Sequence, residues 1–310
     1  MTFRGKILVI RGGAIGDFIL TLPAISALRQ HFPDAFLEVL GYPHIAKLAL
    51  TGGLVNRVQS IEARALAGFF ARNGDLDSDL VDYFSDFDLI ISYLYDPDRI
   101  FETNVALCTR GQFIAGPHRP GKLGREHAAR VFLKPLERLA IFDSDPVPRL
   151  QLPKQVSPLN QLALHPGSGS EEKNWPENKW AELLQHLIDR TTFNLLLVGG
   201  EAEIGRLQRL AAALPPARVR VTQNLPLPEL AMLLPECSGF IGHDSGISHL
   251  AAAIGLPAIL LWGETDPEIW CPPGERITIL HDPSGLASLS VERVIAALTE
   301  LKELPAAGVS

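Results

Sequence analysis

The sequence predicts an α/β protein of two domains, each a doubly wound parallel sheet with helices between its strands. Short β-branched or Leu-rich runs recur along the chain, and each precedes a longer segment with helical spacing, which is typical of βαβ units. The 310 residues are about twice the ~150 expected of one domain. Both halves also begin alike, with a strand that runs into a glycine-containing loop, at Ile7–Asp17 and Leu162–Ser170.

The expected elements follow from these runs in chain order. The strands are Lys6–Ile10, Phe36–Leu40, Asp88–Ser92, Gln161–His165, Phe193–Val198, Arg218–Thr222, Gly239–Gly242, Pro257–Trp262 and Arg276–Leu280. The helices include Asp17–His31, Glu126–Leu139, Asn178–Arg190, Ala202–Ala213, Pro228–Leu233, Ile247–Ile254 and Ser290–Lys302. Between the two groups, repeated prolines from Asp143 to Gln161 favour an extended connector. We therefore predict domains of residues 1–155 and 156–310.

Composition excludes several classes of protein. With 28 Lys and Arg against 35 Asp and Glu, the formal charge is −7, so the chain as a whole has no field that recruits nucleic acid. Its three cysteines lie far apart, which fits neither a disulfide framework nor a zinc site and favours a reducing cytosol. The most apolar stretch, Leu250–Trp262, is shorter than the roughly 20 residues that span a bilayer. We expect a cytoplasmic protein without a membrane span.

The first glycine loop, Arg11–Asp17, ends in a carboxylate at the start of a helix. A dinucleotide-binding fingerprint would need glycine at position 11, so a nicotinamide or flavin site is not expected. Asp17 is either a first-turn acid that satisfies free amides or a general base. Because ligands of open α/β sheets bind outside the carboxyl ends of the strands, a base in this loop would face a ligand cleft lined by both domains.

The second loop, His165–Ser170, leads into Lys173 and Trp175. Small residues let the backbone approach a ligand, while hydroxyls, free amides and a lysine charge suit phosphate oxygens. The alternative for Lys173 is a solvated surface lysine. For Trp175 we favour plain packing.

The third loop, Gly242–His249, joins a strand to an apolar helix. Amides at such a helix start suit a diphosphate, and Asp244 could orient the loop or reach a ligand hydroxyl. Capping by Asp244 or Ser245, with His249 as a buried core histidine, is the equal alternative. The spacing of the His and Asp residues matches no zinc motif, so no metal site is predicted.

Four motifs in order resemble glycosyltransferase family 9, whose best-known members are the ADP-heptose:lipopolysaccharide heptosyltransferases. They are KILVIRGGAIGD…TLPAISALR (Lys6 to Arg29), LHPGS…KNWPxxxW (Leu164 to Trp180), LLVGGE (Leu196 to Glu201) and HDSGISHLAAAIGLP…LWGETDP (His243 to Pro267). The resemblance implies a GT-B fold of two Rossmann-like domains facing across a cleft. It places the acceptor on the N-terminal domain and the sugar nucleotide on the C-terminal one. It also implies that the last helix packs back on the N-terminal domain.

Carried over by position, the resemblance makes Asp17 the general base and Lys173 the diphosphate-binding lysine. It leaves open which serine contacts phosphate and which acid after the Gly199-Gly200 turn contacts the ribose. Leu225, in a loop after a later strand, is expected to pack on the base. The expected substrate-binding residues are Gly13, Gly16, Ser168, Ser170, Glu201, Glu203, Leu225, Asp244, Ser245, Gly246 and His249.

The implied reaction is inverting transfer from a nucleotide-diphospho-sugar, most simply ADP-heptose, to a lipopolysaccharide-type or other glycan acceptor, without metal or cofactor. One departure is Glu268–Cys271, where many members carry a basic or polar run, and it bears on sugar and base specificity. Arg110–Arg138 holds seven Lys and Arg and two acids, a balance of +5. This segment is either a solvated face or a contact for an anionic glycolipid acceptor or for the inner face of the membrane.

Two other functions remain compatible with the sequence. One is a sugar-nucleotide epimerase of GT-B fold, and the other is a sugar-nucleotide-binding protein without catalysis. The presence of both Asp17 and Lys173 favours the transferase, because binding alone needs no base.

Overall fold

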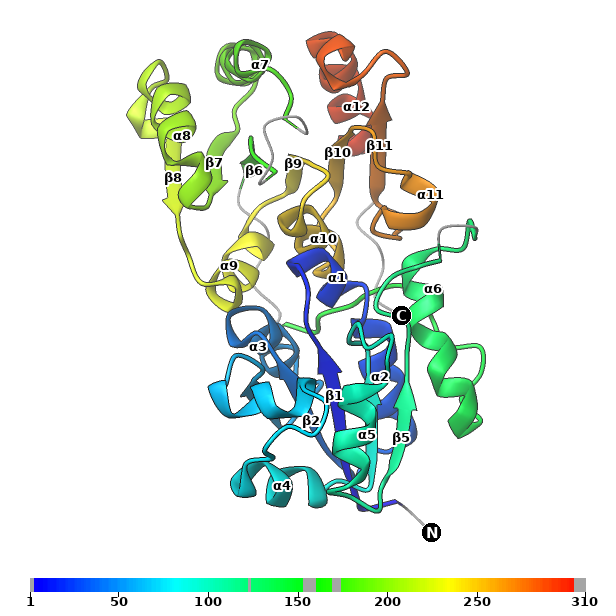
Figure 1. Ribbon diagram of the computed structural model, residues 1–310. Helices are drawn as coiled ribbons and strands as arrows, with labels where there is room; N and C mark the ends of the chain where they lie inside the picture. The colour runs from blue at the N-terminus through cyan, green and yellow to red at the C-terminus, as the bar shows by residue number, and fades with distance from the viewer. Residues whose placement is uncertain (1–2, 122–123, 153–159, 169–173, 304–310) are drawn as a thin grey trace. The chain divides into compact units, whose positions relative to one another are not determined.

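A computed structural model of the chain describes residues 3–121, 124–152, 160–168 and 174–303 (Figure 1). The chain divides into two compact units, Met1–Gln151 and Leu152–Ser310. The division falls inside the proline-rich stretch in which the sequence predicts a connector.

The N-terminal unit is built on a parallel sheet whose described strands have the order β3-β2-β1-β4-β5. Ile7, Leu8, Val9 and Ile10 of the central strand are fully buried, because both faces of the sheet are covered by helices. The strands are β1 (Lys6–Arg11), β2 (Phe36–Gly41), β3 (Arg57–Ser60), β4 (Leu89–Ser92) and β5 (Gln112–Ala115). The helices are α1 (Ile15–Ile19), α2 (Leu22–His31), α3 (Pro43–Thr51), α4 (Ser78–Ser85), α5 (Ile100–Ala106) and α6 (Ala128–Leu133), with 3₁₀ turns η1 (Arg64–Phe70) and η2 (Lys134–Leu139).

The C-terminal unit repeats this plan, and its described strands have the order β11-β10-β9-β6-β7-β8, all parallel. The strands are β6 (Gln161–His165), β7 (Asn194–Gly199), β8 (Val219–Gln223), β9 (Gly239–His243), β10 (Ala258–Trp262) and β11 (Ile277–His281). The helices are α7 (Glu177–Arg190), α8 (Ile204–Ala212), α9 (Leu227–Leu233), α10 (Gly246–Ala253), α11 (Pro267–Trp270) and α12 (Val291–Glu303). The short 3₁₀ turns are η4 (Glu201–Glu203), η5 (Pro216–Arg218), η6 (Leu234–Glu236) and η7 (Leu286–Ser288).

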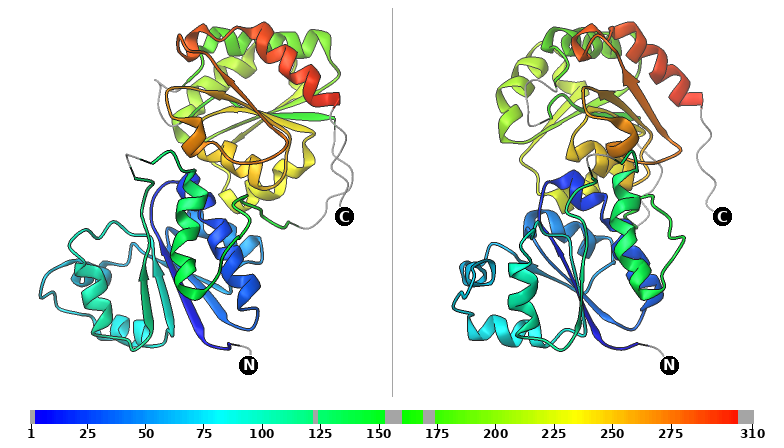
Figure 2. Two further views of the ribbon diagram at one scale, coloured as in Figure 1. Left: turned by 90° about the vertical axis from the view of Figure 1, so that its right-hand side faces the viewer. Right: turned by 45° about the vertical axis from the view of Figure 1, so that its right-hand side comes forward.

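Each unit has its own core, and Figure 2 shows helices on both faces of each sheet. The last helix, α12, buries Val294, Leu298 and Leu301 in the C-terminal core, against the same cluster as Trp180 of α7. These side chains therefore stabilise the helix's own domain. The expected packing of this helix on the N-terminal domain stays a prediction.

The structure interrupts two of the expected helices at prolines. The expected helix Asp17–His31 is two helices, since Pro23 stands in the first turn of α2 and cannot donate a backbone hydrogen bond. The expected helix Glu126–Leu139 begins at Ala128 and tightens to a 3₁₀ turn at Lys134, where Pro135 removes another donor.

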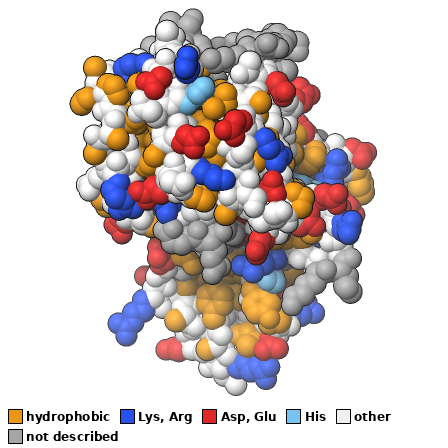
Figure 3. Space-filling view, turned by 90° about the horizontal axis from the view of Figure 1, so that it is seen from above, with side chains coloured by type: hydrophobic (Ala, Val, Ile, Leu, Met, Phe, Trp, Pro, Cys, Tyr) orange, Lys and Arg blue, Asp and Glu red, His pale blue; other side chains and the backbone are white. Residues whose placement is uncertain are grey.

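The surface carries mixed charge. On the face shown in Figure 3, acidic and basic side chains are interspersed rather than gathered by sign. No helix among the described residues combines the length and apolar character that spanning a membrane requires.

Candidate active site

The three loops singled out from the sequence follow β1, β6 and β9. Strand order reverses between β1 and β4 in the N-terminal sheet and between β6 and β9 in the C-terminal sheet, so all three loops start at a switch point. Such switch points open a crevice outside the carboxyl ends of the strands, where open α/β sheets bind ligands. His165 at the end of β6 is the register partner of Gly242 in β9, so the loops that follow these strands start side by side.

Asp17 lies in the first turn of α1, a position compatible both with an acid that satisfies a free amide and with a general base. Its Oδ2 accepts a hydrogen bond from the Ala14 N–H at 3.2 Å, so it does satisfy a free amide of the helix start. Gly13 adopts φ +102°, and a Cβ there would lie 2.9 Å from that oxygen, so the loop needs glycine to approach the carboxylate. The side chain remains 17% exposed. The carboxylate can therefore hold the helix start and still reach a substrate hydroxyl.

Arg11, which is not among the site residues expected from the sequence, lies next to Asp17 with its side chain only 2% exposed. One guanidinium nitrogen, Nη1, donates to the backbone carbonyls of Tyr93 and His118 at 3.3 and 3.0 Å. The other, Nη2, donates to the Asp17 carbonyl at 3.3 Å and lies 3.7 Å from Asp17 Oδ1. Burial lowers the pKa of Arg11, yet a guanidinium stays charged in proteins. A fixed positive charge therefore supports the Asp17 carboxylate.

A pocket of 370 Å³ adjoins this group in the N-terminal domain. His118 lines it, and its ring makes an edge contact with Tyr95 at 4.6 Å between centroids. Arg99 and Arg138 also line the pocket, and Arg99 forms a bidentate pair with Glu102. Burial, followed by the charges of Arg119 and Arg11, lowers the pKa of His118, so this ring is neutral near pH 7.

His243, at the end of β9, connects the second and third loops. Its fully buried ring accepts a hydrogen bond at Nε2 from the Trp175 N–H at 2.9 Å and lies 3.3 Å from the indole Nε1 of Trp180. Its Nδ1 lies 3.1 Å from the Gly167 carbonyl, which can only accept, so Nδ1 carries the proton. Burial lowers the pKa of His243 to about 3. This neutral ring thus fixes the backbone on both sides of the segment that contains Lys173.

Two polar side chains, Glu203 and Arg206, also hold the loop after β6. Glu203 Oε2 accepts the Gly200 N–H at 2.8 Å, and a Cβ at Gly167 would lie 2.2 Å from the Glu203 side chain. Arg206 donates to the Pro166 carbonyl at 3.0 Å. Burial lowers the pKa of the neighbouring His165 to about 4, so this imidazole is also neutral at pH 7. Glu203 therefore shapes the loop from inside, whereas Glu201 is exposed at its edge.

The start of α10 shows the capping that the sequence suggested. Ser245 is the N-cap, and its Oγ accepts the Ser248 N–H at 3.4 Å while lying 3.3 Å from His165 Nδ1. Gly246 is the first helical residue, Asp244 precedes the cap half-buried, and His249 is buried. Capping and anion binding are compatible here, because the other amides of the first turn have no intrahelical acceptor.

The remaining predicted residues have different outcomes. Ser168 donates from its Oγ to Asn174 Oδ1 at 2.9 Å, and Leu225 is half-buried after β8. Ser170 and Lys173 lie outside the described residues. The packing interpretation of Trp175 is confirmed, since its ring is fully buried and its Nε1 donates to the Leu289 carbonyl. Among the described residues, no group of three or more His, Cys, Asp or Glu side chains could hold a metal ion.

The Lys and Arg side chains of the expected basic segment are exposed where the structure describes them. Lys134 pairs with Glu126, and no acidic partner among the described residues pairs with the arginines of the segment. These arginines are Arg110, Arg119, Arg125, Arg130 and Arg138, all exposed, whereas Lys122 lies outside the described residues.

Comparisons with known proteins agree with this architecture. A sequence model of glycosyltransferase family 9 (heptosyltransferase) matches residues 145–296. Lipopolysaccharide heptosyltransferase 1 of Pseudomonas aeruginosa is 27% identical over 290 residues, which cover 84% of this chain and 79% of that protein. The glycosyl transferase family 9 structure from Veillonella parvula superposes with a TM-score of 0.78 at 19% identity, covering 97% of this chain and 98% of that one. The E. coli heptosyltransferase WaaC, solved with ADP, gives 0.77 at 20% identity, covering 96% and 99%.

The two structural likenesses support the GT-B fold of two Rossmann-like domains, and the family match with the curated relative supports the enzyme class. The chain is similar to glycosyltransferase family 9 (heptosyltransferase) over residues 145–296 and to a curated heptosyltransferase over 84% of its length, which indicates that it is a glycosyltransferase.

Proposed function

We propose that this enzyme transfers a heptose from an ADP-heptose-like donor to an anionic, lipopolysaccharide-type acceptor, with inversion and without a metal ion. The observation that carries the proposal is the pair of loops after β6 and β9, joined at their bases by His243 at the switch point of the C-terminal sheet. The choice of ADP and heptose rests on the P. aeruginosa relative and on the ADP bound to WaaC.

In this scheme the C-terminal domain binds the donor. The first-turn amides of α10 and the hydroxyl of Ser168 would contact the diphosphate, and Leu225 would pack on the base. His165 and His243 are neutral, so the compensating positive charge would come from Lys173. We assign the ribose contact to Glu201, because it is exposed while the Glu203 carboxylate holds Gly200.

Asp17 would supply the general base of the transfer. Its carboxylate takes the proton of the acceptor hydroxyl while that oxygen bonds to the anomeric carbon and the bond from that carbon to the diphosphate breaks. Attack opposite the leaving group inverts the anomeric centre. The negative charge that builds on the departing diphosphate is then stabilised by Lys173 and by the amides of α10, which is the contribution that a metal makes in other transferases.

The acceptor would use the N-terminal domain beside Asp17. The 370 Å³ pocket next to His118 has the size of a sugar-binding site, and its arginines together with the exposed basic segment suit an anionic glycolipid. The same segment would let the enzyme contact the anionic surface of a membrane at its cytoplasmic side.

Kinetics of transfer test the role of Asp17. Asp17→Asn should lower kcat by about 10²–10⁴-fold, the range for a positioned base, with donor affinity by calorimetry nearly unchanged. Asp79→Asn is the matched control, since Asp79 is also an acid in the first turn of a helix of the same domain. Turnover by Asp17→Asn within tenfold of the wild type would remove Asp17 from the role of base.

Lys173 and metal independence need separate measurements. Lys173→Ala should weaken ADP binding and lower kcat as well, because its charge acts on the diphosphate in both the ground state and the transition state, whereas Lys173→Arg should retain part of both. Unchanged ADP affinity in Lys173→Ala would mean that Lys173 is a solvated surface lysine that does not contact the diphosphate.

Loss of activity in EDTA would contradict the metal-free scheme.

A further inference from the structure

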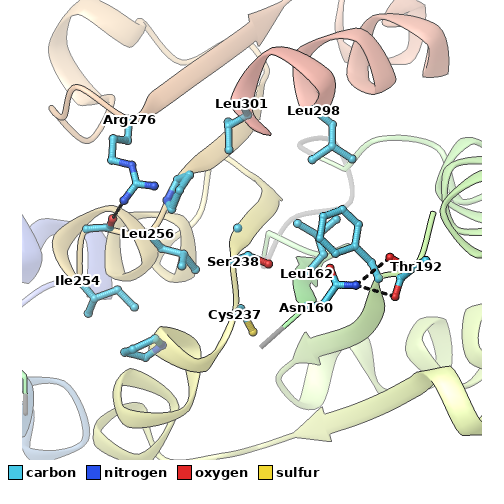
Figure 4. Close-up of a pocket in the computed structure, with 15 residues that line it drawn as sticks. Asn160, Leu162, Thr192, Cys237, Ser238, Ile254, Leu256, Arg276, Leu298 and Leu301 are labelled. Atoms are coloured by element: carbon cyan, nitrogen blue, oxygen red, sulfur yellow. Dashed lines mark hydrogen bonds between the residues drawn. The ribbon is translucent and has the colours of Figure 1, made fainter. Parts of the chain in front are cut away.

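A second cavity, of 580 Å³, lies in the C-terminal domain and is not used by the proposed reaction (Figure 4). Its volume falls in the range of about 300–1,000 Å³ that is usual for small-molecule sites. Its lining is Asn160, Leu162, Thr192, Phe193, Pro235, Cys237, Ser238, Gly239, Ile254, Gly255, Leu256, Pro257, Arg276, Leu298 and Leu301. We refer to this cavity as the rear pocket.

The rear pocket lies at the amino ends of the strands. Leu162 is at the start of β6, Gly239 begins β9, and Arg276 directly precedes β11. The loops assigned to the donor follow the opposite, carboxyl ends of β6, β7, β8 and β9. A strand of five residues separates the two edges by about 16 Å. A ligand in the rear pocket would therefore not compete with the donor for the same groups.

Most polar groups of the rear pocket already have partners. Asn160 Nδ2 donates to the carbonyl and the hydroxyl of Thr192, both at 2.9 Å, as Figure 4 shows. Ser238 Oγ donates to the Gln161 carbonyl at 3.0 Å. Between them, leucines, Ile254 and Phe193 give an apolar interior. An uncharged polar ligand would find few free groups here, whereas a hydrocarbon chain would bury its surface against side chains of its own kind.

Arg276 is the exception. Its Nη1 donates to the Gly255 carbonyl at 3.3 Å, and its Nε is buried without a hydrogen-bond partner. No acidic side chain among the described residues pairs with it. Burial lowers the pKa of Arg276, although the side chain as a whole is only partly buried. A buried polar atom without a partner is costly, and a carboxylate would supply the acceptor and the opposite charge together.

We propose that the rear pocket binds a single-chain fatty acid, with the carboxylate on Arg276 and the chain among Leu162, Leu256 and Leu298. Charge complementarity selects the anionic head, and the apolar lining selects the chain. The site does not depend on the proposed transfer reaction.

Titration calorimetry of the full chain with decanoate, kept below its micelle concentration, tests the proposal. We expect saturable binding of one decanoate, at least tenfold weaker in Arg276→Gln, with decanol and decyltrimethylammonium both at least tenfold weaker than decanoate for the wild type. Ile254 lines the pocket, so the larger indole of Ile254→Trp should occupy part of the space for the acyl chain. This substitution should also weaken binding at least tenfold. Arg190→Gln, an exposed arginine of the same domain outside the pocket, is the control and should bind like the wild type.

Several results would overturn the proposal. Absence of saturable decanoate binding would show that the rear pocket binds no such ligand in solution. Equal affinities for decanol and decanoate would remove the role of Arg276. Displacement of decanoate by ADP would place it at the donor site, whereas binding that is additive with ADP supports the rear pocket. Loss of transfer activity in Asp17→Asn bears on the reaction alone and leaves this test unaffected.

Discussion

Replacing His243 with asparagine should keep the hydrogen bond to Gly167 and remove the hydrogen bonds from Trp175 and Trp180. The amide nitrogen of the introduced asparagine can still donate to the Gly167 carbonyl, but this side chain is too short to offer an acceptor at the position of Nε2. The N–H of Trp175 and the indole N–H of Trp180 are then buried without an acceptor. At about 1–3 kcal/mol for each unsatisfied donor, the C-terminal domain should lose about 2–6 kcal/mol of its unfolding free energy.

Urea denaturation followed by tryptophan fluorescence measures this loss within one domain. The four tryptophans of the chain, Trp175, Trp180, Trp262 and Trp270, all lie in the C-terminal domain, so the signal does not report on the N-terminal domain. His281→Asn, at an exposed position of the same domain, is the matched control and should change stability by less than about 0.5 kcal/mol.

The pH dependence supplies an independent readout. The folded pKa of His243 is about 3 and that of His165 about 4, both below the unfolded value of about 6.5. The unfolded state therefore binds more protons below pH 6.5, and the stability that neutral burial provides is complete above that pH and is lost as pH falls towards the folded values. From pH 7 to pH 5 each histidine should remove about 2 kcal/mol. His243→Asn should remove one of these two contributions.

Two results would refute this reasoning. A loss below about 1 kcal/mol in His243→Asn would mean that the tryptophan donors find other acceptors. An unchanged slope of stability against pH would mean that His243 is not a neutral buried ring in the folded protein.

Four further measurements test individual residues and ligands of the site. Glu201→Gln should raise the donor KM about tenfold without changing the melting temperature. Glu203→Ala should lower the unfolding free energy by about 1–3 kcal/mol, because the Gly200 N–H loses its acceptor. The opposite pattern would mean that Glu203 contacts the ribose and Glu201 supports the loop. Gly13→Ala should lower both stability and kcat, since its Cβ would meet Asp17 at φ +102°, and wild-type kinetics would show that the loop does not hold the base. Charge reversal of Arg119 and Arg125 together should weaken sedimentation with anionic liposomes at least tenfold, at about 1 kcal/mol or more per charge, and equal binding to neutral liposomes would refute membrane contact. ADP should raise the melting temperature more than UDP or GDP, and a larger shift with either of these would retain the transferase and overturn the choice of heptose donor.

Strands buried on both faces could be predicted from the sequence because they read as continuous apolar runs. β1, β6 and β10 are of this kind, and their expected positions agree with the structure to within one residue. β3 and β5 were missed because they are four-residue edge strands with half-exposed patterns, which resemble loops. The N-terminal helix was expected to be continuous because helical periodicity persists through Thr21, where only Pro23 signals the break.

The loops of the site could be found because glycine, serine and aspartate stand just after predicted strands. The groups that support these loops could not. Arg11 reaches Tyr93, 82 positions along the chain, and His243 reaches Trp175, 68 positions before it. Such pairs form only once the sheet is assembled. In the sequence, Arg11 stands out only because a dinucleotide-binding fingerprint would have glycine at that position.

Product balance during turnover tests the central claim most directly. The enzyme is incubated with ADP-heptose and an anionic glycolipid acceptor, while ADP is measured by chromatography and the acceptor by mass spectrometry. Transfer predicts one ADP released for each acceptor that gains one heptose, with the anomeric configuration inverted in the product by NMR and with the same product forming about 10²–10⁴-fold more slowly in Asp17→Asn. Nucleotide release without a new glycosidic bond would indicate the epimerase chemistry instead. Tight ADP-heptose binding with no turnover on any acceptor would contradict the account altogether.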